Sequence, residues 1–325
     1  MKFYSIVIVG FLSLSFIPFD KPARKVFRYC KTVENAYVND AGVFNGKFER
    51  IYDGHVVEAG NYDDGLKTGL WASMDVEGHV VKKVGYKSGL LDGAVSLTFP
   101  DGKPRVTGAY RTGLKIGAWA FYDSDNRIVK KGSYVDNVPK GIWEYYDKGK
   151  LIEKYDFDAK KELVNNREAL RFSDDEIKFK SAYMDKGYYY REVIDVPIDG
   201  VRPLGGYRKS KEYFGQNIEI PQDVWFTTIT QTYFTTYKIL ANGAFGDITV
   251  SRIKKPYLPY KTGMDYQFNT FSNNGERINI DERTLFHLAD NIKENFDILY
   301  GPWIVASGNN IVGSVQMNFV VNLQF

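Results

Sequence analysis

The chain has 325 residues, of which 44% are hydrophobic, and this excludes a disordered protein and leaves room for two domains. Its 43 basic and 40 acidic residues leave a formal charge of +3. No basic block of the kind that grips phosphates stands out, so nucleic acid is not an expected partner. Aromatic residues reach 16% and favour strands, which predicts a β-rich fold.

The chain opens with an apolar segment, residues 3–19, which follows Lys2 and precedes Asp20. Such a segment is typical of an export signal. It is slightly shorter than the ~20 residues that a membrane-spanning helix needs. We predict that residues 1–19 are a signal peptide, with an uncleaved N-terminal anchor as the alternative. The protein is then expected in the periplasm, or anchored to the inner membrane and facing the periplasm; only an uncleaved segment would associate it with the membrane.

A frame of 24 residues then recurs four times, with the same residue types at three of its positions. These are the tyrosines Tyr62, Tyr86, Tyr110 and Tyr134, the glycines Gly69, Gly93, Gly117 and Gly141, and the apolar residues Trp71, Val95, Trp119 and Trp143. A degenerate earlier copy surrounds Phe48, so the array is predicted to cover residues 36–157.

Each period of the frame contains two turn signals. The first, three residues after the tyrosine, is a residue that accepts a positive φ: Gly65, Gly89, Gly113 or Asn137. The second, half a period later, is a pair that tight hairpins prefer: Glu77-Gly78, Asp101-Gly102, Asp125-Asn126 or Lys148-Gly149. Two turns per period predict two short strands per repeat, stacked so that the Trp and Tyr side chains form ladders on one face.

This frame resembles the MORN repeat, in the variant of bacterial proteins where Gly-x-Tyr-x-x-Gly-x-x-x-Gly-x-Trp recurs through an antiparallel meander. The resemblance implies a scaffold or an interaction surface and no particular activity. We interpret the repeated Tyr and Trp residues as packing between repeats, with ligand contact as the alternative.

Charged residues crowd the next segment, 158–195, which we predict to be a connector with room for a short helix. Its acidic run Asp174-Asp175-Glu176 lacks the glycine and the alternating oxygen donors of a calcium loop. We therefore expect a solvated surface there and no metal site.

Residues 196–325 show the periodicities of an α+β domain. A short helix is predicted through Tyr213 and Asn217, and a β-hairpin with its turn at Asn242-Gly243 follows. Asp281 is a candidate N-cap for an amphipathic helix. The chain ends on an alternating strand, whose apolar positions are Val315, Met317, Phe319, Val321, Leu323 and Phe325.

These elements resemble the C-terminal domain of TonB. Gly205-Gly206, Asn217, Pro221, Gly243 and Asp247-Ile248-Thr249-Val250 match its pattern in order, whereas Ile220 replaces a usual Tyr and 254–280 reads as an insertion. The resemblance implies capture of an extended segment of an outer-membrane transporter, added as a strand to the sheet. The candidate docking strand is the edge formed by residues 315–325; the alternative is that this is merely the last buried strand.

Other classes of protein find little support. The three histidines, His55, His79 and His287, are isolated, and no nucleophile-elbow serine is present, so we expect no catalytic, cofactor or metal site. An outer-membrane barrel is disfavoured, because the predicted array strands are short and interrupted by Gly, Asp and Lys.

We therefore expect a non-enzymatic envelope protein that binds other proteins through a TonB-like C-terminal domain, with the array as scaffold or spacer and a link to TonB-type transport. The 11 prolines are scattered, so the long proline-rich linker of an energy transducer is missing from the pattern. The alternative is a MORN-repeat scaffold or antitoxin-like interaction protein, in which the C-terminal domain is a structural cap.

Overall fold

The computed structural model describes residues 23–29, 31–167, 188–194, 201–217, 230–253, 282–305 and 313–324. The predicted export segment 1–19, the acidic run at 174–176, and the residues Pro221 and Phe325 lie outside this described part. The predictions made for them are therefore left as predictions.

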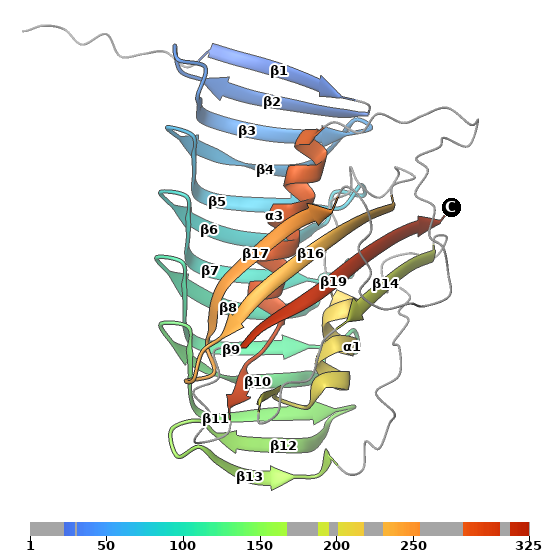
Figure 1. Cartoon of the computed structure of the whole chain (residues 1–325). Helices are drawn as coiled ribbons and strands as arrows, with labels where there is room; N and C mark the ends of the chain where they lie inside the picture. Colours follow the sequence, from blue (N-terminus) through green and yellow to red (C-terminus); the bar gives the residue numbers. More distant parts are fainter. Residues whose placement is uncertain are drawn as a thin grey trace, which may run out of the picture.

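Thirteen strands pair in chain order into a single antiparallel sheet, which confirms the predicted meander (Figure 1). They are β1 Ala23–Tyr29, β2 Thr32–Val38, β3 Phe44–Tyr52, β4 His55–Asp63, β5 Leu66–Met74, β6 Val80–Lys87, β7 Leu90–Thr98, β8 Pro104–Arg111, β9 Leu114–Tyr122, β10 Ile128–Val135, β11 Val138–Asp147, β12 Lys150–Asp156 and β13 Lys161–Asn165. Because every strand pairs with its neighbours in the chain, the sheet is built from local contacts.

The turns have the backbone conformation that the frame predicts. At the first turn φ is +79° for Gly65, +77° for Gly89, +80° for Gly113 and +68° for Asn137. At the second turn φ is again positive, for Gly78, Gly102, Asn126 and Gly149. Left-handed geometry at both turns reverses the chain twice per period, as a stack of hairpins requires.

The sheet is longer than the predicted array of residues 36–157. β1 and the start of β2 precede that range, and β13 lies inside 158–195, the segment predicted to be a connector. β13 pairs with β12 over Lys161–Asn165, so this charged segment is an edge strand. Charged residues on an edge strand discourage pairing with another chain, which is why the segment resembles a solvated connector in the sequence.

The remaining described residues form two more sheets and two helices. The strands are β14 Tyr188–Ile194, β15 Val201–Pro203, β16 Thr230–Ile239, β17 Phe245–Ile253, β18 Trp303–Val305 and β19 Gly313–Gln324, and the helices are α1 Tyr207–Asn217 and α3 Glu282–Leu299. One sheet has the order β14-β19-β16-β17, and the other pairs β15 with β18. The helices and the hairpin turn at Asn242-Gly243 lie where the sequence predicts them.

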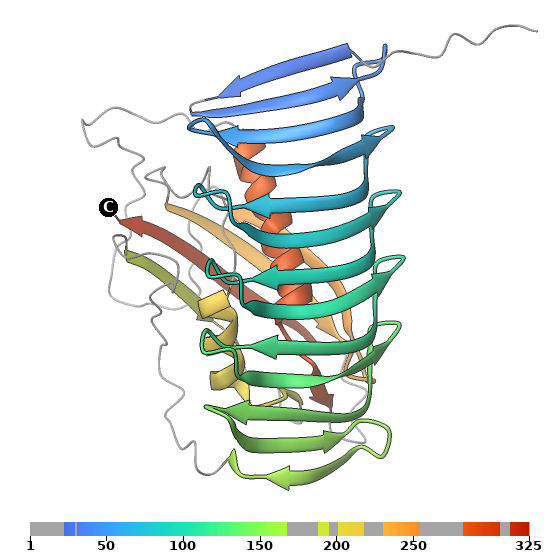
Figure 2. The same cartoon turned by 180° about the vertical axis from the view of Figure 1, so that it is seen from behind.

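The helices lie between the thirteen-stranded sheet and the four-stranded sheet, as the two opposite views show (Figures 1 and 2). We call the face of the thirteen-stranded sheet that is turned toward the helices the front face, and the other the back face. A single hydrophobic cluster contains Trp119 and Trp143 of the front face, Phe214 of α1, Phe296 of α3 and Tyr237 of β16. The array and the C-terminal elements therefore share one core.

Candidate protein-binding site

The repeated aromatic residues lie on the front face, where each Trp packs against tyrosines of the neighbouring strands. The ring centroids are 4.9 Å apart for Trp71 and Tyr62, 6.2 Å for Trp71 and Tyr86, 5.3 Å for Trp119 and Tyr110, 5.9 Å for Trp119 and Tyr134, and 4.9 Å for Trp143 and Tyr134. All five pairs are edge-to-face, a geometry that adds roughly 0.5–1.5 kcal/mol to the burial itself. The ladder therefore packs repeat against repeat.

A further position of the frame, the glycine two residues before the tyrosine, is missing from the predicted set. A Cβ at Gly60 would overlap the Trp71 indole ring, and Gly108 and Gly132 stand in the same relation to Trp119 and Trp143. In the repeat where Val95 replaces Trp, this position is Val84, and the two valines pair in register and are both buried. Two valines thus fill the space of one Trp and one Gly. The glycine two residues before three of the four tyrosines is the signal in the sequence that could have revealed this packing.

A buried network of charged residues extends the front face toward β2. Arg50 contacts Glu58 at 2.5 Å and Glu34 at 2.8 Å, and Lys67 lies 3.2 Å from Glu58. The Lys67 ammonium also lies 4.0 Å from the Trp71 ring centroid, a cation–π contact. Because two positive and two negative charges meet here, the burial of each is compensated.

The C-terminal half of α3 is held on the front face by side chains of the array. Lys82 of β6 forms an ion pair with Glu294 at 3.2 Å, and Lys115 of β9 forms one with Asp297 at 3.2 Å. The Tyr110 hydroxyl donates a hydrogen bond of 2.6 Å to Asp297. These side chains come from strands spread over three repeats, so α3 ties the repeats together.

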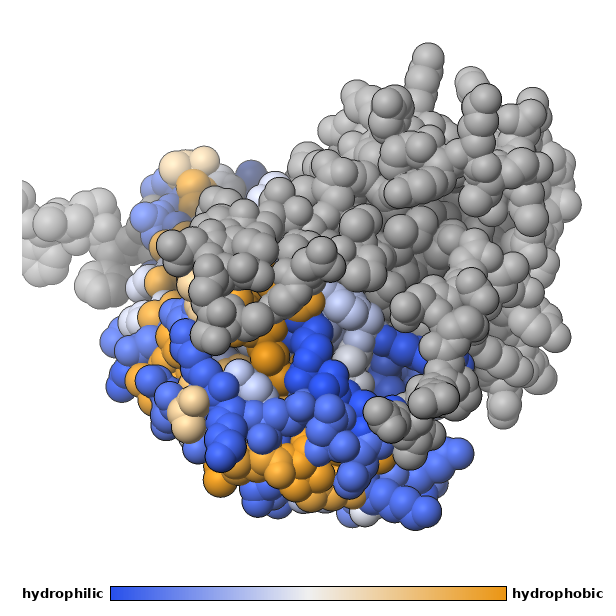
Figure 3. Space-filling view, turned by 60° about the horizontal axis from the view of Figure 1, so that its bottom comes forward, coloured by the Kyte–Doolittle hydropathy of each residue, from blue (hydrophilic) through white to orange (hydrophobic). Residues whose placement is uncertain are grey.

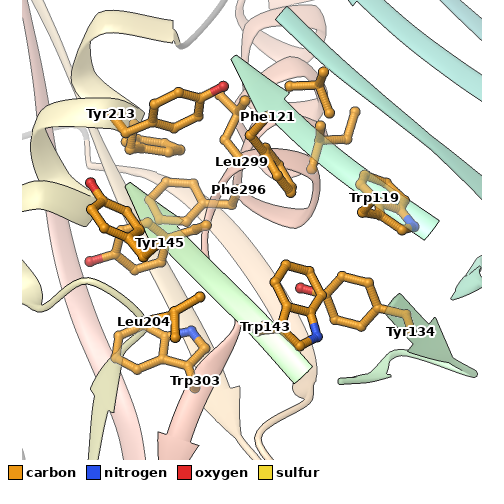
Figure 4. Close-up of a cluster of buried hydrophobic side chains, with 14 of the residues drawn as sticks. Trp119, Phe121, Tyr134, Trp143, Tyr145, Leu204, Tyr213, Phe296, Leu299 and Trp303 are labelled. Carbon is orange, nitrogen blue, oxygen red and sulfur yellow. The ribbon is translucent and has the colours of Figure 1, made fainter. Parts of the chain in front are cut away.

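The end of α3 is bound by Lys130 of β10. This lysine donates hydrogen bonds to the main-chain oxygens of Leu299, at 2.8 Å, and Gly301, and its ammonium lies 4.3 Å from the Phe121 ring centroid. In Figure 4, Phe121 faces Leu299 and Phe296. The last carbonyls of a helix lack partners within it and carry negative partial charge, so a buried cation satisfies both needs.

Burial shifts the titration of these groups. Desolvation holds the pKa of Lys130 well below its usual value, and the positive charge of Lys115 adds to this effect. Burial also lowers the pKa of Lys115, although Asp297 acts in the opposite direction. The pKa values of Tyr110 and Tyr134 are raised, first by burial and then by the negative charge of Asp297.

Helix α1 is held at both ends by charges of opposite sign. Ahead of its first turn, the buried carboxylate of Glu153 on β12 accepts hydrogen bonds from the Gly205 amide at 2.8 Å and from Arg202 at 2.6 Å. At its last residue, Asn217, the main-chain oxygen accepts a hydrogen bond of 2.5 Å from Arg105 on β8. A carboxylate at the N-terminus and a guanidinium at the C-terminus both complement the helix dipole.

The predicted docking strand is β19, which includes Val315, Met317, Phe319, Val321 and Leu323. It pairs with β16 on one side, and with β14 on the other side over Asn318 to Gln324. The expectation that it forms an edge is therefore wrong, because residues of the predicted connector supply β14 as an additional strand. Among the described strands, the edges of this sheet are β14 and β17.

Two of the histidines lie at the hairpin turns, as their spacing in the frame predicts. His55 begins β4 and is exposed, and the His79 ring lies 3.0 Å from the Asp75 carboxylate. In the described residues, Asp75, Glu77 and His79 are close enough together to hold a metal ion. The same turn of the following repeats carries ion pairs, Lys103 with Asp101 at 2.7 Å and Arg127 with Asp123 at 2.8 Å. The pair of His79 and Asp75 is therefore explained by the repeat itself.

Exposed apolar side chains recur directly after the first turn of three of the four repeats, at Leu66, Leu90 and Leu114. Leu66 lies against Gly89 of the next turn, and Leu90 lies in the same way against Gly113. Seen from the β13 end, hydrophobic residues alternate with hydrophilic ones on the described surface (Figure 3). These leucines are thus spaced along the first turns, and two of them lie beside the turn glycine of the next repeat.

No model of a known protein family matches the chain, and a search of curated proteins finds no relative. None of the helices in the described ranges is long and apolar enough to cross a membrane. The described residues offer a thirteen-stranded array, two helices fixed to it through buried charges, and a four-stranded sheet whose described edges are β14 and β17.

Proposed function

We propose that the chain is a non-enzymatic protein-binding scaffold of the cell envelope. In this proposal the thirteen-stranded sheet is a MORN-type platform, and residues 196–325 are a TonB-like α+β unit that takes an extended segment of a partner protein as an added strand. A link to TonB-type transport is part of the proposal, with an outer-membrane transporter segment as the partner. The apolar segment of residues 3–19, which we predict to be an export signal, supports the location.

The observation that carries the proposal is the way the four-stranded sheet is mounted. The buried contacts of Glu153, Arg105, Lys115 and Lys130 fix α1 and α3 to the array. The four-stranded sheet lies on the far side of these helices from the array (Figure 1). A sheet that is held rigidly and has strand edges can bind an extended peptide through main-chain hydrogen bonds.

A second candidate function is a MORN-type scaffold or antitoxin-like interaction protein whose partner binds the array, with the C-terminal elements as a cap. The shared core of the front face and the two helices favours this alternative. The back face of the array would then be the binding surface.

Site-specific photocrosslinking of the full chain in its native envelope separates the two functions. One photoreactive residue replaces Glu192 on β14, a second replaces Thr249 on β17, and a third replaces Leu70, which is 59% exposed on β5. The proposed function predicts that an envelope protein is captured from Glu192 or Thr249 and not from Leu70. Capture from Leu70 alone would support the cap, and capture of only cytosolic proteins would contradict the location.

A further inference from the structure

The four-stranded sheet contains one strand that differs in origin from the others. β16 and β17 form a hairpin, and β19 follows α3 and β18 near the end of the chain. β14, in contrast, comes before α1 in the chain and is the first of the four strands in sequence, whereas its partner β19 is the last. No turn joins it to β19; it is held by its pairing with β19 and by contacts with α1.

β14 covers only part of the edge that β19 presents. β19 is 12 residues long, and β16 pairs with it from Gly313 to Asn322. β14 pairs with it from Asn318 to Gln324 and extends over 7 residues. On that side, no described strand pairs with Gly313 to Met317. A longer strand placed there would form more main-chain hydrogen bonds than β14 does.

The hydrogen bonds and ion pairs that the described side chains form between the C-terminal elements and the array come from other segments. Described hydrogen bonds and ion pairs to the array involve Arg202 and Gly205 before α1, Tyr213 and Asn217 within it, and Asp297 in α3. Loss of β14 pairing would leave all of these in place. Although β14 also contacts α1, the described polar contacts that attach the sheet to the array do not depend on it.

We propose that β14 is a displaceable strand, which occupies in cis the edge of β19 where an extended segment of another protein adds to the sheet. This inference rests on the proposed function and specifies its site: the partner replaces β14 beside β19 and does not add to the edge of β17. In the free protein β14 covers an edge that would otherwise pair with other chains.

Hydrogen exchange on the unmodified chain tests the mobility of β14 directly. The amides of β14 are expected to exchange at least 100-fold faster than those of β16 in the same sheet, because β14 opens without the rest. Equal protection of the two strands would overturn the proposal.

A peptide with the sequence of residues 187–196, labelled with fluorescein, serves as the incoming strand in a binding titration. A full-length variant in which a Gly-Ser stretch of equal length replaces residues 188–194 is expected to bind this peptide at least tenfold more tightly than the unmodified chain. If this variant is folded, as judged by its thermal unfolding, and binds no better, the proposal fails.

A disulfide supplies the reverse test, in a chain whose single cysteine, Cys30, is replaced by serine. Cysteines at Glu192 and Val320, which are register partners, lock β14 onto β19 when oxidised. The matched control joins Thr235 to Val250 and so locks the β16–β17 hairpin. Oxidation is expected to weaken peptide binding at least tenfold in the first variant, reversibly, and to leave the control unchanged. Equal binding by both oxidised forms would contradict the proposal.

The same set of variants separates this inference from the function on which it rests. If the locked chain with the photoreactive residue at Thr249 still captures an envelope protein, the proposed function stands and displacement of β14 is wrong. If peptide exchange occurs but no envelope protein is captured, displacement stands and the function is wrong. A dimer that exchanges β14 between two copies, seen as a doubled mass in light scattering, would overturn the choice of another protein as the occupant.

Discussion

Gly108 and its equivalents Gly60 and Gly132 must be glycines because the indole ring on the neighbouring strand leaves no space for a Cβ atom. Their φ angles lie outside the left-handed region, and an added Cβ would meet an indole ring. This explains why a glycine stands in the middle of a strand, where it weakens β-structure by its own propensity. The pair Val84 and Val95 shows that the space can also be filled in another way.

Gly108→Ala is expected to lower the free energy of unfolding by about 1–3 kcal/mol, because the methyl group overpacks the site against Trp119. The double variant Gly108→Val, Trp119→Val copies the pair of Val84 and Val95 and should recover part of the loss. Ala118→Leu is the control, since the equivalent Leu70 is exposed, and it should change the value by less than about 0.5 kcal/mol. Denaturant titrations measure all three, and a Gly108→Ala variant as stable as the parent would refute the packing argument.

The buried lysines determine how stability depends on alkaline pH. Between the lowered pKa values of Lys115 and Lys130 and the unfolded value of 10.5, the folded chain binds fewer protons than the unfolded chain. The free energy of unfolding therefore rises with pH in that window. Tyr110 and Tyr134 act in the opposite direction above their unfolded value of 10.0, because the unfolded chain then loses protons first.

We expect the free energy of unfolding to rise with pH to a maximum near pH 10 and then to fall. Each proton contributes at most about 1.4 kcal/mol per pH unit. Lys130→Met should flatten the rise and leave the fall, which belongs to the tyrosines, unchanged. Denaturant titrations at several pH values between 7 and 11 provide the measurement. Identical profiles for the parent and the variant would show that Lys130 does not titrate differently in the folded state.

At the scale of elements, the array positions both helices through their ends. Arg105 meets the last residue of α1, Lys130 meets the last carbonyls of α3, and Glu153 lies before the first turn of α1. The front face thus presents charges whose signs match the helix dipoles. Burial makes these contacts specific, because an unpaired charge there would be strongly unfavourable.

Asp297→Ala is expected to destabilise the chain by about 3 kcal/mol, because it leaves Lys115 buried without its carboxylate and Tyr110 without its acceptor. The α3 amides should also exchange faster, because the free energy of the opening that exposes them should fall by a similar amount. Arg111→Ala is the control, since its ion pair with Asp136 is exposed and contributes less than about 1 kcal/mol. If the two variants lose the same small amount of stability, α3 is not held by Asp297.

The local features of these elements could be predicted from the sequence, and the long-range ones could not. Turns at Gly65 and Asn137 follow from the φ preferences of single residues, and the two helices follow from apolar periodicity. In contrast, Lys115 lies between two apolar residues and Lys130 lies next to Lys131, so both resemble ordinary surface residues of a strand in the sequence. Their burial depends on α3, which lies far along the chain. The place of β14 beside β19 cannot be predicted from the sequence for the same reason.

At the scale of the whole molecule, the shared core makes the array and the C-terminal elements interdependent. Trp119 and Trp143 are almost fully buried in a cluster that includes Phe296 and Trp303 (Figure 4). Removal of the C-terminal elements would expose this face. The role of those elements is therefore better tested with point variants and strand locks than with truncation.

A chain that ends at residue 167 is expected to aggregate or to unfold at a temperature at least about 10 °C lower than the full chain, because it exposes the apolar part of the front face. Size-exclusion chromatography and a thermal melt measure this. A monomeric fragment with an unchanged melting temperature would show that the array is stable alone and that the shared core adds little.

The orientation of α3 has a mechanical consequence. Hydrogen bonds between strands point along the stack, so tension applied to the two ends of the array loads them one strand at a time. α3 runs across the strands, and Lys82, Lys115 and Lys130 anchor it to β6, β9 and β10 (Figure 1). Strand separation that starts at β1 or β13 would thus stop at the strands that α3 joins. Further separation there requires several buried contacts of α3 to break together.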